Sequence, residues 1–155
     1  MTTTKDQQYQ AAIADISALI KGEPNLIANL ANTAAELRTA FDFFWVGFYL
    51  VDGRELTLGP FQGPSACTRI AHGRGVCGTS WAHAESIIVP DVHQFPGHIA
   101  CSPLSKSEIV VPIIKSGKVR AILDIDSPHL NAFDQTDQTH LEHLAQILSE
   151  SFSVE

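Results

Sequence analysis

The chain has 155 residues, of which 45% are hydrophobic and 17% charged, and its net charge at pH 7 is −7. This composition is typical of one globular domain, spanning residues 1–155, that is large enough to bury a hydrophobic core. No apolar run approaches the roughly 20 residues that span a bilayer. Because there is no basic cluster, neither nucleic acid nor an anionic membrane is an expected partner.

The N-terminal segment and the cysteine content indicate a cellular compartment. The first ten residues, MTTTKDQQYQ, are polar and unlike a secretory signal peptide. The three cysteines are an odd number, and without an export signal they are expected to be reduced thiols. The sequence therefore predicts a cytoplasmic protein.

Two helices are expected first, within residues 6–40. In residues 6–20, Ile13, Ile16 and Ile20 recur at helical spacing. After the GEP tripeptide, an Ala- and Leu-rich helix is expected over residues 25–40, capped by its first residue, an asparagine.

The pattern then changes to that of strands. Residues 43–52 are aromatic and β-branched, and the DGR turn that follows predicts a hairpin with residues 55–61. Shorter strands are expected at 66–71 and 86–90, with a short helix between them that begins near Gly78.

Two long strands, 108–115 and 118–126, are expected to form a hairpin around Ser116 and Gly117. An amphipathic helix over 134–152 follows, with a stripe formed by Leu141, Leu144, Ile147 and Leu148. The sequence thus predicts an α+β fold, in which a central antiparallel sheet and pocket, residues 43–127, are flanked by helices at both ends of the chain.

Alternation along the strand 118–126 sorts its side chains between two faces. One face, expected to pack on the helices, receives Val119, Ala121, Leu123 and Ile125. The opposite face receives Arg120, Ile122, Asp124 and Asp126. The two aspartates are therefore expected in a row, about 7 Å apart.

The length of the hairpin loop decides whether Glu108 joins them. A two-residue loop would pair Glu108 with Ile125 and place it on the other face, whereas a three-residue loop would pair it with Asp126. Gly117 suits either loop, so both registers remain open. Such acids are ordinarily solvated surface groups, but carboxylates gathered without a cationic partner cost stability, so a ligand is a possible source of the missing cation.

The three cysteines occur in different contexts. Cys67 lies in an expected strand and Cys77 between glycines, both compatible with a small buried side chain. Cys101 lies among Pro96, Gly97 and Pro103, which predicts a loop, where exposed function concentrates. No metal is expected, because CxxC and HxxxH pairs are absent and the histidines lack ligand spacing. The segment HGRGVCG has no phosphate-loop GK[ST].

Five segments, in order, carry a family resemblance: WVGFYL, GRGVCG, DVHQFPGHIAC, SEIVVPI and LDIDSP. Together they resemble the free methionine-(R)-sulfoxide reductases, which are built on a GAF fold, from about Phe43 to Phe133. The sequence departs from that family at Ser102, where an aspartate often follows the reactive cysteine. A carboxylate role at this position is therefore not expected.

The resemblance implies that Cys101 is the nucleophile and Cys67 the resolving thiol, with Cys77 secondary. It also implies a pocket lined by Trp45, Glu108, Asp124 and Asp126. Tyr49 shares a strand face with Trp45, so both are expected to hold the S-methyl end of the substrate through aromatic–sulfur contact. The implied reaction needs no cofactor; a nearby acid protonates the leaving oxygen, and thioredoxin reduces the resulting disulfide.

Two other functions are compatible with parts of this pattern. A non-catalytic GAF module that senses a small molecule is the main alternative, although such a module has no need of three cysteines. A peroxide-reducing thiol protein is the other, but the peroxiredoxin-type PxxxTxxC segment is absent. A homodimer is expected by family likeness.

Overall fold

A computed structural model describes residues 2–99 and 101–154 of the chain. Its centre is a six-stranded sheet with the order β3-β2-β1-β6-β5-β4, in which all neighbours are antiparallel. The strands are β1 (Trp45–Asp52), β2 (Glu55–Gln62), β3 (Arg69–Ala71), β4 (Ile87–Val89), β5 (Ser107–Lys115) and β6 (Lys118–Ser127). The α+β architecture expected from the sequence is confirmed.

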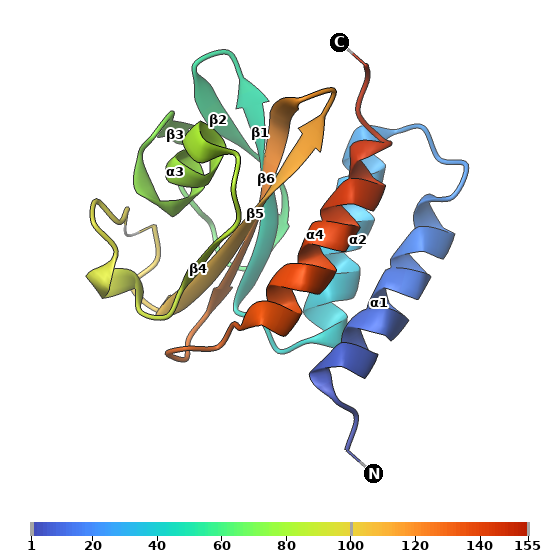
Figure 1. Ribbon diagram of the computed structural model, residues 1–155, viewed down its shortest axis with the longest axis horizontal. Helices are drawn as coiled ribbons and strands as arrows, with labels where there is room; N and C mark the ends of the chain where they lie inside the picture. Colours follow the sequence, from blue (N-terminus) through green and yellow to red (C-terminus); the bar gives the residue numbers. More distant parts are fainter. Residues whose placement is uncertain (1, 100, 155) are drawn as a thin grey trace.

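Three long helices, α1 (Lys5–Ile20), α2 (Leu26–Ala40) and α4 (Gln135–Ser149), cover one face of the sheet (Figure 1). Helices α2 and α4 contact the strands, and α1 packs on both of them. The apolar face of β6 and the stripe of α4 meet in a buried core. The predicted helices are thus present, and each begins at a side-chain cap: Thr4, Asn25 and Asp134.

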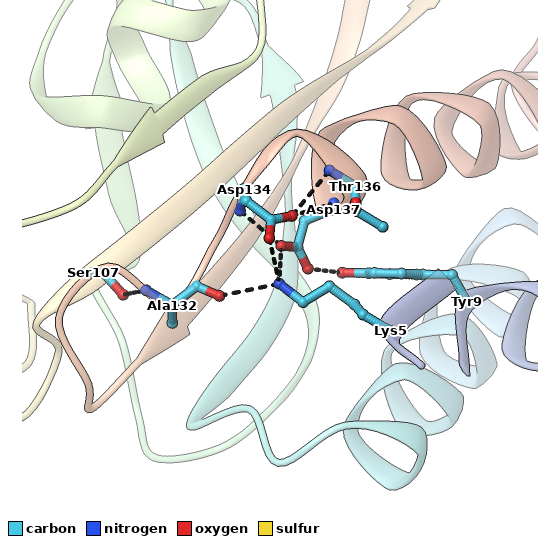
Figure 2. Close-up of polar contacts among 7 residues, drawn as sticks. All are labelled: Lys5, Tyr9, Ser107, Ala132, Asp134, Thr136 and Asp137. Carbon is cyan, nitrogen blue, oxygen red and sulfur yellow. Dashed lines mark hydrogen bonds and ion pairs between the residues drawn. The ribbon is translucent and has the colours of Figure 1, made fainter. Parts of the chain in front are cut away.

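A polar network ties α1 to the start of α4 (Figure 2). The Lys5 Nζ lies 2.6 Å from Asp137 Oδ2 and 3.3 Å from Asp134, and the Tyr9 hydroxyl donates to the buried Asp137 carboxylate. Lys5 also reaches the carbonyl oxygen of Ala132, whose N–H donates to Ser107 Oγ at the start of β5. The helical layer is therefore fastened to the start of β5, one residue before Glu108.

The opposite face of the sheet carries α3 (Gly75–His83), the short 3-10 helix η1 (Val92–Gln94) and the loops around them (Figure 1). A second apolar cluster lies beneath them and includes Trp45, Tyr49, Cys77 and Ile122. No helix in the described part of the chain is long and apolar enough to cross a membrane.

Two predicted boundaries were wrong. Helix α3 begins at Gly75 rather than near Gly78, so Cys77 lies inside a helix instead of a glycine loop. The glycine run does not stop the helix, because the positive φ of Gly73 and Gly75, 78° and 63°, turns the chain directly into it. Strand β3 begins at Arg69, where its register with β2 starts, and Cys67 lies in the loop before the strand.

The β5–β6 hairpin combines a two-residue turn with a β-bulge. Lys115 pairs with Lys118 and Ile114 with Val119, but Ile113 pairs with Ala121, so Arg120 is the extra residue. The bulge shifts the register beyond it by one, and Glu108 pairs with Asp126.

Two predicted side-chain orientations were wrong because of this bulge. Val119 packs in the cluster beneath α3, not against the long helices. The guanidinium of Arg120 lies over the Phe152 ring on the helical side, 5.5 Å from its centroid. Simple alternation fails there because the bulge inserts one residue, whereas from Ala121 to Asp126 it holds.

Candidate active site

A pocket of about 50 Å³ lies on the sheet face opposite the long helices. Its floor is formed by β5 and β6, and its walls by β1, α3 and the loop residues 65–66, 98–99, 101–102 and 105. The structure brings around it seven of the eight residues singled out in the sequence: Trp45, Tyr49, Cys77, Cys101, Glu108, Asp124 and Asp126. The eighth, Cys67, is covalently bonded to one of them.

Two aromatic side chains of β1 form one wall. Trp45 and Tyr49 are 4% and 2% exposed, with ring centroids 6.1 Å apart. The indole lies across Gly47, where an added Cβ would stand 2.4 Å from a ring carbon. Both polar ends are used, because Trp45 Nε1 donates to the Pro64 carbonyl at 2.9 Å and the Tyr49 hydroxyl to the Cys67 carbonyl at 2.8 Å. The wall thus places two aromatic rings at the pocket and anchors the neighbouring loop.

Three carboxyl groups gather on the floor. Glu108 on β5 is directly opposite Asp126 on β6, and Asp124 follows on the same face of β6. Glu108 and Asp124 are each 6% exposed. The Ser105 hydroxyl donates to Asp126 at 3.1 Å, whereas Asp124 Oδ1 has no hydrogen-bond partner among the described residues. The ion pairs that the structure describes involve none of these three carboxyls.

This environment changes the acidity of the cluster. Burial raises the pKa of Glu108 well above its usual value, and the charges of Asp124 and Asp126 raise it further. Burial also raises the pKa of Asp126 and, less strongly, that of Asp124, where contacts with Glu108 and Cys77 oppose the increase. Like charges at such close range favour shared protons, so the cluster can keep a proton near neutral pH.

Cys67 and Cys101 form a disulfide, with Cα atoms 5.5 Å apart. The bond joins the loop before β3 to the loop before β5, across 34 residues of sequence. Cys101 is half-buried at the pocket, on a loop as predicted. Cys77 is a free, buried thiol, and burial together with the neighbouring carboxylates raises its pKa.

Some pocket residues were missed in the sequence. Arg74, His98 and Ser105 all line the pocket. Arg74 stands between Gly73 and Gly75 directly before α3, and this glycine-flanked position is the sequence signal that could have found it. His98 was seen only as a scattered histidine, and burial lowers its pKa. No sequence pattern indicates Ser105, because its hydrogen bond to Asp126 depends on the β5–β6 register that positions that carboxyl.

One group of donor atoms has a composition suited to a metal ion. Cys77 Sγ and carboxylate oxygens of Glu108 and Asp124 lie within 4.8 Å of one another, and all three residues are buried. Sequence spacing gave no sign of the group, because its members come from α3, β5 and β6.

Comparison with known proteins agrees with this geometry. The sequence model of the GAF domain family matches residues 21–152. GAF domain-containing protein A of Dictyostelium discoideum is 56% identical over 146 residues, covering 94% of this chain and 92% of that protein. The free methionine-R-sulfoxide reductase of Escherichia coli is 45% identical over 141 residues, covering 90% of this chain and 86% of that enzyme.

A solved structure extends the likeness to three dimensions. The X-ray structure of free methionine-R-sulfoxide reductase from Neisseria meningitidis, in complex with its substrate, superposes with a TM-score of 0.95. The two sequences are 51% identical, and the match covers 98% of this chain and 92% of the other. The family and fold expected from the sequence are thus confirmed. The chain belongs to the GAF domain family and, within it, to the free methionine-R-sulfoxide reductases.

Proposed function

We propose that the protein reduces free L-methionine-(R)-sulfoxide to L-methionine, with Cys101 as nucleophile and Cys67 as resolving thiol. The observation that supports this most directly is that Cys101 is bonded to Cys67 and lines the same pocket as the three carboxyls. The reductases to which the chain is similar carry the same activity in their names.

The reaction begins with the reduced protein. The Cys101 thiolate attacks the sulfoxide sulfur, the oxygen is protonated and passes to Cys101 as a sulfenic acid, and methionine leaves. We assign the protonation of the sulfoxide oxygen to Glu108, whose pKa is raised by burial. The Cys67 thiol then displaces water from the sulfenic acid and forms the disulfide.

Recycling needs an external dithiol. Thioredoxin is the assigned reductant: its thiolate attacks the disulfide, and two electrons restore both cysteines. No cofactor takes part in this scheme. The assigned compartment is the cytoplasm, where the thioredoxin pool keeps thiols reduced.

Recognition of the free amino acid is assigned to the acidic cluster. Asp124 Oδ1, buried and without a partner among the described side chains, is positioned to accept a hydrogen bond from the substrate ammonium. Trp45 and Tyr49 form the apolar wall for the S-methyl group. A peptide-bound residue has a neutral amide in place of the ammonium, so the buried carboxylates would lose their counter-charge.

The experiment compares free and N-acetylated methionine-(R)-sulfoxide under steady-state turnover. N-acetylation is expected to lower kcat/KM by roughly a hundredfold, the equivalent of about 3 kcal/mol. Asp124→Asn should lower kcat/KM for the free substrate and so narrow its advantage over the N-acetylated compound. Cys101→Ser should abolish reduction of both. Equal efficiency on the two compounds would refute the ammonium pocket. Binding of methionine sulfoxide without turnover by the reduced protein would instead support a sensory module.

A further inference from the structure

We propose that the protein binds a thiophilic divalent cation, such as Zn²⁺ or Cd²⁺, between the Cys77 thiolate and the carboxylates of Glu108 and Asp124. The three donor atoms lie within 4.8 Å of one another, and each belongs to a buried residue. Among the residues that the structure describes, these three form the group of acidic, histidine or cysteine side chains whose donor atoms are close enough to share a metal ion.

Three different elements hold the donors in place. Cys77 comes from α3, Glu108 from β5 and Asp124 from β6, and α3 contacts both strands. On the other side of Asp124, its partner in β1 is Gly47, across which the indole of Trp45 lies. Donors on helices and strands are held more accurately than donors on loops, which favours a defined coordination geometry.

An independent feature points to a missing ligand. Asp124 is 6% exposed, yet its Oδ1 has no hydrogen-bond partner among the described residues. A buried carboxylate oxygen without a partner is costly, and coordination to a cation removes that cost. Asp124 is also one of the residues that line the pocket.

The charges and donor types favour a soft or borderline cation. Two carboxylates and a thiolate supply three negative charges once Glu108 and Cys77 have released their protons to solvent. Thiolate ligands select Zn²⁺ and similar ions, whereas Mg²⁺ and Ca²⁺ prefer sites made entirely of oxygen. Asp126, oriented by the Ser105 hydroxyl, stands opposite Glu108 and can hold that ligand in place.

The geometry requires a small contraction. Zinc sits about 2.3 Å from a thiolate sulfur and about 2.0–2.2 Å from a carboxylate oxygen in tetrahedral sites, so its donors stand roughly 3.5 Å apart. The three side chains therefore move inward by about 1 Å or less. A water molecule completes the tetrahedron, for which the pocket of about 50 Å³ has room.

Such an ion would compete with the substrate. It takes the carboxylates that the proposed function assigns to the ammonium, so the two cannot bind together. This inhibition rests on the proposed function, whereas the binding of the ion does not.

The oxidised protein allows a selective test. With Cys67 and Cys101 in their disulfide, Cys77 is the remaining thiol of the three in the sequence. Titration with Cd²⁺ is followed by the ultraviolet charge-transfer absorption of cadmium–thiolate bonds, which histidines and carboxylates do not give. The absorption is expected to saturate at one ion per chain, and Kd should fall as the pH rises because binding releases the protons of Cys77 and Glu108.

Two variants and a control locate the site. Cys77→Ser should remove the absorption. Asp124→Asn keeps the thiol and the size of the side chain, and should weaken binding by at least about tenfold. The control, Asp91→Asn, removes a carboxylate that pairs with His93 on the surface, and should bind Cd²⁺ as the wild type does. Thermal unfolding of each variant checks that it is folded.

Three results would overturn the site: no thiolate absorption at one equivalent of Cd²⁺, the same absorption in Cys77→Ser, or unchanged affinity in Asp124→Asn. The titration contains no substrate, and turnover is measured separately with a chelator present. A failure of metal binding is therefore distinguishable from a failure of the reductase function.

Discussion

The hydroxyl of Tyr49 donates a hydrogen bond to the backbone carbonyl of Cys67, at 2.8 Å. Tyr49 belongs to a central strand and is 2% exposed, whereas Cys67 lies in a loop. The Tyr49 side chain therefore links the sheet to Cys67, at one end of the disulfide. Trp45 holds the same loop three residues earlier, at Pro64.

Removal of this hydrogen bond should slow disulfide formation. In Tyr49→Phe the ring remains but the Cys67 carbonyl loses its donor, which at about 1 kcal/mol corresponds to a severalfold to tenfold effect. Rapid quenching and alkylation of the reduced protein, after one equivalent of sulfoxide, would measure methionine and disulfide separately. The lag between them should lengthen. A disulfide that closes at the wild-type rate would show that Tyr49 does not position Cys67.

Loss of the resolving thiol should separate the first turnover from recycling. Cys67→Ser is expected to yield one methionine per chain and then stall with thioredoxin, because the sulfenic acid on Cys101 has no partner. A small thiol such as dithiothreitol should restore turnover. If thioredoxin supports wild-type rates, the resolving role passes to Cys77.

Acidification should stabilise the unliganded, oxidised protein through the acidic cluster. Burial and neighbouring charges raise the pKa of Glu108 and Asp126 above their usual values near 4. As the pH rises from there toward the raised values, the folded protein binds more protons than the unfolded chain, so the free energy of unfolding falls. One such carboxyl contributes a slope of up to about 1.4 kcal/mol per pH unit.

Urea unfolding between about pH 5 and 8 measures this slope. Glu108→Gln should flatten it and should be more stable than the wild type at the upper end, where the wild-type carboxyl is charged. Asp91→Asn, on the surface, is the control and should keep the slope. If the free energy of unfolding rose with pH by the same amount in the wild type and in both variants, the protonated cluster would be contradicted.

Deletion of Arg120 should leave the acidic cluster intact. Because Arg120 is the extra residue of the bulge, its removal converts β5–β6 into a regular hairpin in which Ile114 still pairs with Val119 and Glu108 with Asp126. The side chain contacts Phe152 and donates to the Ser153 carbonyl, so its loss carries a cost of its own.

The matched variant is Arg120→Ala, which loses the side chain but keeps the residue. The deletion and Arg120→Ala should differ by less than about 1 kcal/mol in free energy of unfolding and retain similar selectivity for the free substrate. A deletion that loses activity while Arg120→Ala keeps it would mean that the bulge itself sets the position of Glu108.

The fold class was predictable because its signals are local. Helical spacing in α1 and α4, the caps at Asn25 and Asp134, and the DGR turn depend on residues near one another in the chain. The alternation from Ala121 to Asp126 likewise assigned the two aspartates to the pocket face. The grouping of three cysteines and Trp45 came from the family resemblance rather than from these periodicities.

The position of Glu108 was decided by tertiary structure. Sequence alone left two loop lengths open, and the structure adopts neither simple solution: the turn has two residues, and a bulge at Arg120 restores the pairing of Glu108 with Asp126. Packing determines this outcome, since Ile109 and Val111 must face the long helices together with Leu123 and Ile125. The approach of Cys77 to Glu108 and Asp124 was also invisible in the sequence, because it depends on how α3 lies across two strands. Local chemistry thus determined which strand residues alternate, whereas burial of a shared core fixed which carboxyls meet.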